Sequence, residues 1–99
     1  MAGNEIARLL QERREEILRL AAHHGAEKVR VFGSVARREA RPDSDVDILV
    51  TMKDGGTLLD LIALGQDLEE LLGRKVHLVS DGGLSPYLRD SILREAVAV

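Results

Sequence analysis

The sequence predicts a small α/β domain in which helices pack on a mixed β-sheet. Segments with the helical spacing of apolar residues alternate with short runs of β-branched residues, and turn-forming residues separate them. The 99 residues leave room for one domain, which we take to be residues 1–99. Only about one helical turn fits between the first two predicted strands, so we expect at least one antiparallel pair.

The first half of the chain predicts a long helix, a strand, a short helix and a second strand. Apolar residues recur at helical spacing from residue 4 to about residue 24. Val29 and Val31 then alternate with polar residues in a strand that ends near Phe32, and residues 34–39 form a short helix. Residues 45–51 are rich in β-branched side chains and predict the second strand.

The second half predicts a helix, a strand and a final helix. Thr57, with an acidic residue three positions later, is a capping-box signal for a helix that stops at Gly73. Residues 75–79 predict the third strand. Ser85, followed by proline, begins a helix that we expect to extend to Ala96.

The composition excludes several classes of function. The chain has no cysteine, so disulfide frameworks, thiolate metal sites and cysteine nucleophiles are excluded. A formal net charge of −3 and an aromatic content of 2% disfavour nucleic acid as a partner. With no signal peptide and no apolar run of membrane-spanning length, we expect a cytoplasmic protein without a membrane partner.

Asp45 and Asp47 lie two residues apart on the second predicted strand. Side chains alternate between the faces of a strand, so both carboxylates project to the same side, with Cα atoms about 6.6 Å apart. Two such charges about 5 Å apart repel by roughly 3 kcal/mol at an effective dielectric constant of about 20. A divalent cation would remove this repulsion, and Mg²⁺ is typically bound by such carboxylates. A solvated strand face without an ion is the simpler interpretation of the pair alone.

Gly33 and Ser34 follow the first predicted strand. A glycine allows a tight turn and the close approach of a phosphate to the main chain, and the amide groups that open a helix favour anions. Arg37, one turn later, has a guanidinium group that suits phosphate oxygens. Alternatively, Ser34 is simply the N-cap of the short helix, and the arginine is solvated or pairs with Glu39.

Residues 33–50 (GSVARREARPDSDVDILV) resemble the G-S-x-A-R…S-D-x-D-[IL] signature of the DNA polymerase β-like nucleotidyltransferase superfamily. The short chain, with residues 73–79 and 83–97, looks like the minimal, MntA-like branch, and the resemblance covers nearly everything from Val29 onward. It implies the polymerase β-like palm fold and an enzyme that transfers a nucleoside monophosphate to a hydroxyl group, in this branch AMP from ATP.

The same resemblance implies roles for individual residues. Asp45 and Asp47 bind the catalytic metal ions, Mg²⁺ or alternatively Mn²⁺, and Gly33 and Ser34 hold the β- and γ-phosphates of ATP or another nucleoside triphosphate. Arg37 stands at the family's motif arginine, with an expected role in contacting phosphate or supporting the strand. Two metal ions in such a site clamp the attacking and leaving oxygens of an in-line displacement.

His77 stands where the family has a third carboxylate, on the strand after the long helix. A nitrogen ligand suits Mn²⁺ or Zn²⁺ better than Mg²⁺. Because imidazole titrates near neutral pH, His77 could instead be a general base. Alternatively, it is an ordinary strand histidine in a site with weak or absent turnover. Asp81, four residues later in a predicted turn, is a poor substitute for the missing acid.

The resemblance also implies a protein partner. Every segment is used by the sheet and its helices, so we expect another protein to supply the acceptor. In the MntA-like branch this partner is a HEPN-domain toxin whose tyrosine receives AMP, and the nucleotidyltransferase is the antitoxin. Two functions stay open: an enzyme that transfers AMP, and an antitoxin of weakened or no activity that neutralises its partner by contact because His77 replaces the third acid.

Overall fold

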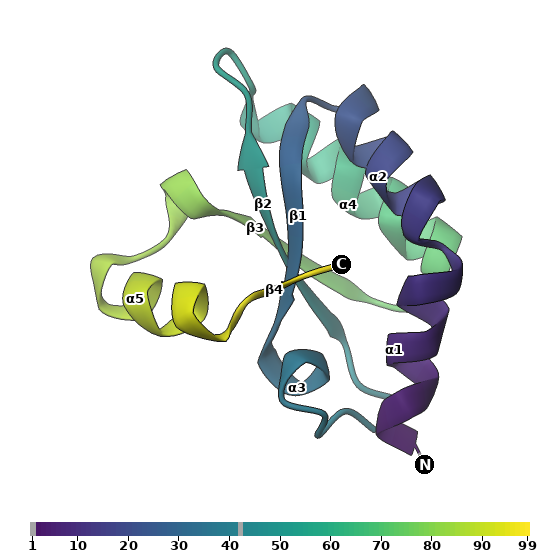
Figure 1. Ribbon diagram of the computed structural model, residues 1–99. Helices are drawn as coiled ribbons and strands as arrows, with labels where there is room; N and C mark the ends of the chain where they lie inside the picture. The colour runs from purple at the N-terminus through teal and green to yellow at the C-terminus, as the bar shows by residue number, and fades with distance from the viewer. Residues whose placement is uncertain (1, 42) are drawn as a thin grey trace.

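A four-stranded mixed sheet in the order β3-β2-β1-β4 forms the centre of the fold (Figure 1). The structure is a computed structural model that describes residues 2–41 and 43–99. In these residues the elements are, in chain order, α1 (Ala2–Glu12), α2 (Arg14–His23), β1 (Ala26–Phe32), α3 (Gly33–Ala36), β2 (Val46–Met52), α4 (Leu58–Leu72), β3 (Val76–Ser80), the 3₁₀ turn η1 (Asp81–Gly83), α5 (Pro86–Glu95) and β4 (Val97–Ala98).

The strand directions follow from the lengths of the connections. β1 and β2 are antiparallel, as expected, because the connection between them contains only one short helix, the four-residue α3, and a loop. β2 and β3 are parallel, since the 15-residue helix α4 carries the chain back along the sheet. β4 pairs antiparallel with β1 at the other edge. The predicted mixed sheet is therefore present.

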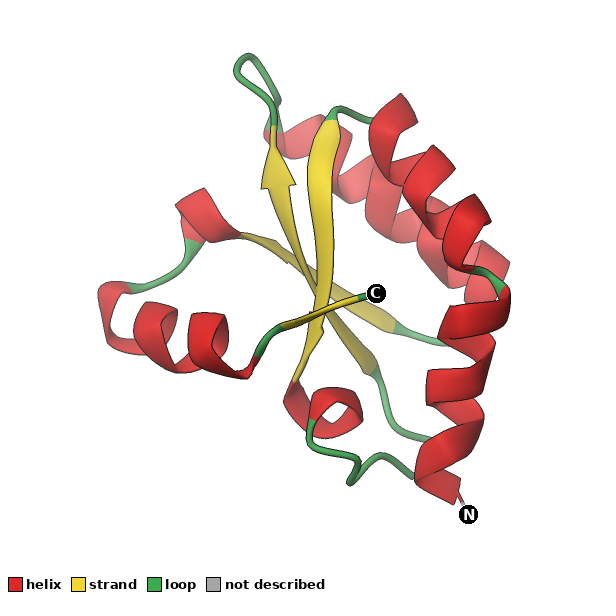
Figure 2. Cartoon of the chain, viewed as in Figure 1, coloured by secondary structure: helices red, strands yellow, loops and turns green. Residues whose placement is uncertain are grey.

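The two faces of the sheet are covered unequally. Helices α1, α2 and α4 form a layer on one face, whereas α5 lies on the opposite side (Figure 2). Val46, Ile48 and Val50 of β2 are fully buried in the main core, which α2 and α4 also line. Leu49 alternates with them, lies on the other face with Asp47, and is also fully buried. Asp47 therefore lies on the face that the large helical layer does not cover.

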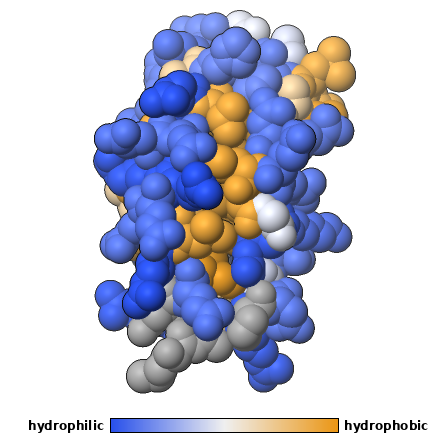
Figure 3. Space-filling view, turned by 90° about the vertical axis from the view of Figure 1, so that its right-hand side faces the viewer, coloured by the Kyte–Doolittle hydropathy of each residue, from blue (hydrophilic) through white to orange (hydrophobic). Residues whose placement is uncertain are grey.

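The helical layer leaves part of its apolar surface open. Figure 3, which faces this side of the molecule, shows an apolar strip between polar flanks. Leu9, Leu20 and Leu71 are side chains of this layer that are only partly buried. Among the described residues, no helix is long and apolar enough to cross a membrane.

Helix α4 has the ends that the sequence predicts. The Thr57 hydroxyl accepts a hydrogen bond from the Asp60 N–H, and the Asp60 carboxylate accepts one from the Thr57 N–H, which completes the capping box. Gly73 ends the helix with a φ of +66°. Ser85 likewise caps α5, with proline at the first helical position.

The short helix α3 spans Gly33–Ala36 rather than residues 34–39, and three other boundaries that differ from the prediction bear on the fold and the site. The expected long helix is broken at Arg13 (φ −101°, ψ 10°), so α1 and α2 are separate helices although the apolar spacing continues. The last helix ends at Glu95, because Ala96 is extended and the residues after it pair with β1. β2 begins at Val46, so Asp45 lies just before the strand.

Candidate active site

Gly33 turns the chain from β1 into α3. Its φ of +70° lies in the left-handed region that favours glycine. A Cβ atom at this position would overlap Oδ2 of Asp47 and lie 3.0 Å from its Cγ. Asp47 is this close because it is the cross-strand partner of Phe32 in the β1–β2 pair. The backbone angle and the contact with Asp47 therefore both require glycine.

Asp45, Asp47 and His77 come together at the beginning of β2. Asp47 and His77 are partners in the parallel β2–β3 register, which places their side chains on the same face. Nε2 of His77 lies 3.0 Å from Oδ2 of Asp45, and Nδ1 of the same ring lies 3.5 Å from Oδ1 of Asp47. The two carboxylates thus lie on the same side, as their spacing predicts.

The imidazole of His77 lies between the two acids. Nε2 faces a carboxylate oxygen of Asp45, and Nδ1 faces one of Asp47. A neutral ring has one N–H donor and one acceptor nitrogen, whereas a charged ring has a donor at both positions. In either form the ring separates the two acids and contacts both.

Asp47 is the most enclosed of the three side chains. It is 24% exposed, against 41% for Asp45 and 53% for His77. Burial raises the pKa of the Asp47 carboxyl; the charge of His77 lowers it, and the charge of Asp45 raises it again, with a net upward shift. Binding a divalent cation would stabilise the ionised form that burial and Asp45 disfavour.

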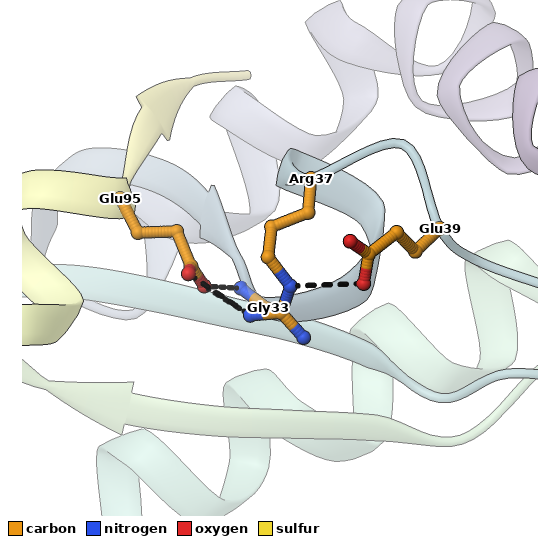
Figure 4. A network of polar contacts seen from close by, with 4 residues as sticks. All are labelled: Gly33, Arg37, Glu39 and Glu95. Atoms are coloured by element: carbon orange, nitrogen blue, oxygen red, sulfur yellow. Dashed lines mark hydrogen bonds and ion pairs between the residues drawn. The ribbon is translucent and has the colours of Figure 1, made fainter.

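Arg37 makes contacts with two glutamates (Figure 4). Its Nη1 donates to both carboxylate oxygens of Glu95, at 3.0 and 2.9 Å, and its Nε donates to Oε2 of Glu39 at 3.2 Å. The Gly33 N–H also donates to Oε1 of Glu95. The hydrogen bonds with Glu95 raise the pKa of Arg37, and the same pairing lowers the pKa of Glu95. The pairing of Arg37 with Glu39 was an alternative from the sequence, whereas Glu95 was not foreseen.

Ser34 lies in α3 and Asp81 in η1, and neither belongs to the acid pair. Ser34 is not the N-cap of α3, because the helix begins at Gly33 and Phe32 occupies the cap position without a side-chain hydrogen bond. Asp81 is engaged away from the acid pair: its Oδ2 accepts from the Thr51 hydroxyl at 2.7 Å and from Nη2 of Arg30 at 3.4 Å. Asp81 therefore does not supply the third carboxylate, which the family has at the position of His77.

Asp45 and Asp47 can supply only some of the ligands that a metal ion needs. Within residues 2–41 and 43–99, no three His, Asp or Glu side chains are arranged to hold a metal ion together. Asp45 and Asp47 still present two carboxylates on one side, with enough exposure for other ligands to approach. Mg²⁺ is commonly bound by one or two carboxylates, waters and substrate phosphates. The residues thus fit an ion that takes most of its ligands from outside the protein rather than a closed structural site.

Known proteins with similar sequences and structures agree with this fold. The model of the nucleotidyltransferase domain family matches residues 10–99. The protein adenylyltransferase MntA of Thermococcus cleftensis is 41% identical over 95 residues, which cover 96% of this chain and 93% of that protein. A solved structure described as a minimal nucleotidyltransferase superposes with a TM-score of 0.83 at 52% identity, and the match covers 100% of this chain and 97% of the other.

A more distant neighbour shares the fold alone. It is a complex of the MNT antitoxin with a tri-AMPylated HEPN toxin of Shewanella oneidensis, which matches with a TM-score of 0.68 at 22% identity, covering 89% of this chain and 69% of the other. The mixed α/β fold of the minimal nucleotidyltransferases, which the sequence predicts, is confirmed by these matches. The family model matches about nine-tenths of the chain, and this chain therefore belongs to the nucleotidyltransferase domain family.

Proposed function

We propose that this chain is a metal-dependent nucleotidyltransferase that transfers AMP from ATP to a hydroxyl group of a HEPN-domain toxin, and that it is the antitoxin of that pair. The observation that carries the proposal is the convergence of Asp45 and Asp47 on one side of β2, with Asp47 directly against Gly33. The protein adenylyltransferase of Thermococcus cleftensis supports AMP as the transferred group. The AMPylated toxin in the Shewanella oneidensis complex supports the kind of acceptor. Because ATP is the donor, we place the reaction in the cytoplasm.

Each candidate residue has a role in this proposal. Asp45 and Asp47 hold Mg²⁺ or Mn²⁺ through their carboxylate oxygens, and the bound ion supplies positive charge beside the phosphates and the acceptor oxygen. The Gly33 N–H, the Ser34 hydroxyl and the Arg37 guanidinium bind the β- and γ-phosphates. Ser34 follows Gly33 in α3 and is only half-buried, so its hydroxyl can donate to a phosphate oxygen.

The reaction forms a bond between the acceptor oxygen and the α-phosphorus of ATP. It breaks the bond between that phosphorus and the bridging oxygen, so pyrophosphate leaves, and the acceptor hydroxyl loses its proton. His77 is the titratable side chain beside the two acids that is suited to accept this proton. It needs a free ring nitrogen to do so, which requires its contact with Asp45 or Asp47 to open.

Transfer of label from α-labelled ATP to a HEPN-domain partner, with Mg²⁺ and then with Mn²⁺, tests the proposal. The label should reach the partner with the wild-type chain and fall to background with Asp47→Asn. Asp54→Asn is the matched control, because Asp54 is an exposed acid in the turn that follows the same strand. Absence of transfer with either ion, or equal transfer by Asp47→Asn, would contradict the enzyme.

The second candidate is an antitoxin that neutralises its partner by contact, with weakened or no catalysis. It is favoured by His77, whose ring meets both acids at the position of the family's third carboxylate. In a growth assay with the toxin, a contact antitoxin would protect equally well as wild type and as Asp47→Asn, whereas an enzyme would lose protection. Transfer that occurs only after His77→Asp would identify a degraded catalytic site.

A further inference from the structure

The carboxylate of Glu95 bridges two elements that lie far apart in the sequence. Glu95 is the last residue of α5, and it accepts hydrogen bonds from the Gly33 N–H and, on both oxygens, from Nη1 of Arg37 (Figure 4). Arg37 and Glu95 are 58 positions apart. An oxyanion thus already occupies a backbone amide and a guanidinium group next to Asp47.

The same two donors are the ones that the proposed function gives to phosphate. Carboxylates and phosphates are both oxyanions, and a guanidinium group makes paired hydrogen bonds with either. The single N–H of Gly33 cannot point fully at a carboxylate and a phosphate together. Glu95 and a bound polyphosphate therefore exclude each other at these groups.

The contact with Glu95 is of a kind that can exchange. The side chain of Arg37 is 48% exposed and that of Glu95 is 26% exposed, and partly exposed ion pairs contribute little net stability. No residue of α5 is buried, and the following strand β4 pairs with β1 at only two positions. Among the described residues, the hydrogen bonds that join the end of α5 to Gly33 and Arg37 all involve the Glu95 carboxylate, so a stronger anion can compete for these donors.

We propose that Glu95 sets the affinity of the nucleotide site: in the free protein its carboxylate occupies the Gly33 amide and Arg37, and a polyphosphate binds by displacing it. This inference rests on the proposed function in assigning the β- and γ-phosphates to those groups. The apparent affinity for any anion is then reduced by the fraction of molecules in which Glu95 is in place. A triphosphate, with its larger charge, displaces the carboxylate more readily than a single phosphate does.

Calorimetric titration of tripolyphosphate, and then of ATP with Mg²⁺, tests this inference on three forms of the chain. Glu95→Gln should bind both ligands about three- to tenfold more tightly than wild type, because a neutral amide competes less well for Arg37. Glu39→Gln is the matched control: it loses a partner of the same arginine but leaves Gly33 untouched, and its affinity should change less than about twofold. Glu95→Asp, whose shorter side chain does not span both donors, should also bind more tightly.

The outcomes separate this inference from the proposed function. Equal or weaker polyphosphate binding by both Glu95 variants, with thermal unfolding showing that they are folded, overturns the inference even if wild type transfers AMP. Tighter binding by these variants supports it even if wild type transfers no AMP, a result that would remove the proposed function alone. If tripolyphosphate and ATP bind to no form of the chain, both are overturned.

Discussion

Replacement of Gly33 by alanine tests the link between the turn after β1 and the carboxylate pair. The new methyl group would enter the space that Oδ2 of Asp47 occupies and would lie 3.0 Å from Cγ of Asp47. Carbon atoms in ordinary contact are about 3.5–4.0 Å apart. The carboxylate of Asp47 therefore has to move by about 1 Å, away from the position it holds against His77.

Two effects contribute to the expected loss of stability. A non-glycine residue at φ +70° is strained by about 1 kcal/mol. Overpacking against Asp47 adds about 1–3 kcal/mol. A misplacement of about 1 Å at a catalytic group also lowers the rate by about 100-fold. We therefore expect Gly33→Ala to lose about 2–4 kcal/mol of unfolding free energy and about two orders of magnitude of AMP transfer.

Gly73→Ala is the matched control for this experiment. Gly73 has nearly the same backbone angle, with φ of +66°, but a Cβ atom there would meet nothing within 4 Å. Urea unfolding of both variants should therefore give a loss of about 1 kcal/mol for Gly73→Ala, from backbone strain alone. Equal losses for the two variants, or full AMP transfer by Gly33→Ala, would refute the proposed contact between the turn and Asp47.

Three more measurements follow from the structure. Burial raises the pKa of the Asp47 carboxyl above 3.8, so the folded state keeps this proton to higher pH than the unfolded state, and the stability of wild type falls as pH rises through the raised pKa. Asp47→Asn should therefore unfold at a higher temperature than wild type at pH 7, and a lower unfolding midpoint would contradict this. Arg37 lowers the pKa of the Glu95 carboxyl below 4.5, so the stability from this ion pair is present above pH 4.5 and is lost as pH falls through the lowered pKa. The difference in unfolding free energy between wild type and Glu95→Gln should shrink in that pH range, and a constant difference would contradict the pairing. Thr57→Ala should lose about 1 kcal/mol in urea unfolding by removing the side-chain cap of α4, whereas Thr57→Ser should retain most of it.

The sequence predicted the parts of the fold that depend on local signals. The two ends of α4 are examples, since Thr57 and Gly73 act through hydrogen bonds and backbone angles within a few residues. The break at Arg13 was missed because the apolar spacing runs on through it. The short strand β4 was also missed, since its extended form depends on pairing with β1, a contact between distant parts of the chain.

The candidate site divides in the same way. The spacing of Asp45 and Asp47 was enough to place both carboxylates on one side, and the resemblance pointed to His77. The contact of Gly33 with Asp47 and the pairing of Arg37 with Glu95 could not be predicted, because each depends on the register or packing of separate elements. Glu95 in particular has the sequence context of an ordinary helix-end residue.

Binding of Mn²⁺ to the chain in the presence of a non-hydrolysable ATP analogue is the most direct test of the carboxylate pair. Wild type and the control Asp54→Asn should bind the ion with the same affinity, and Asp45→Asn and Asp47→Asn should each bind it at least about tenfold more weakly, because each removes a negatively charged oxygen ligand. Unchanged Mn²⁺ affinity in both Asp45→Asn and Asp47→Asn would show that these acids do not hold a metal ion.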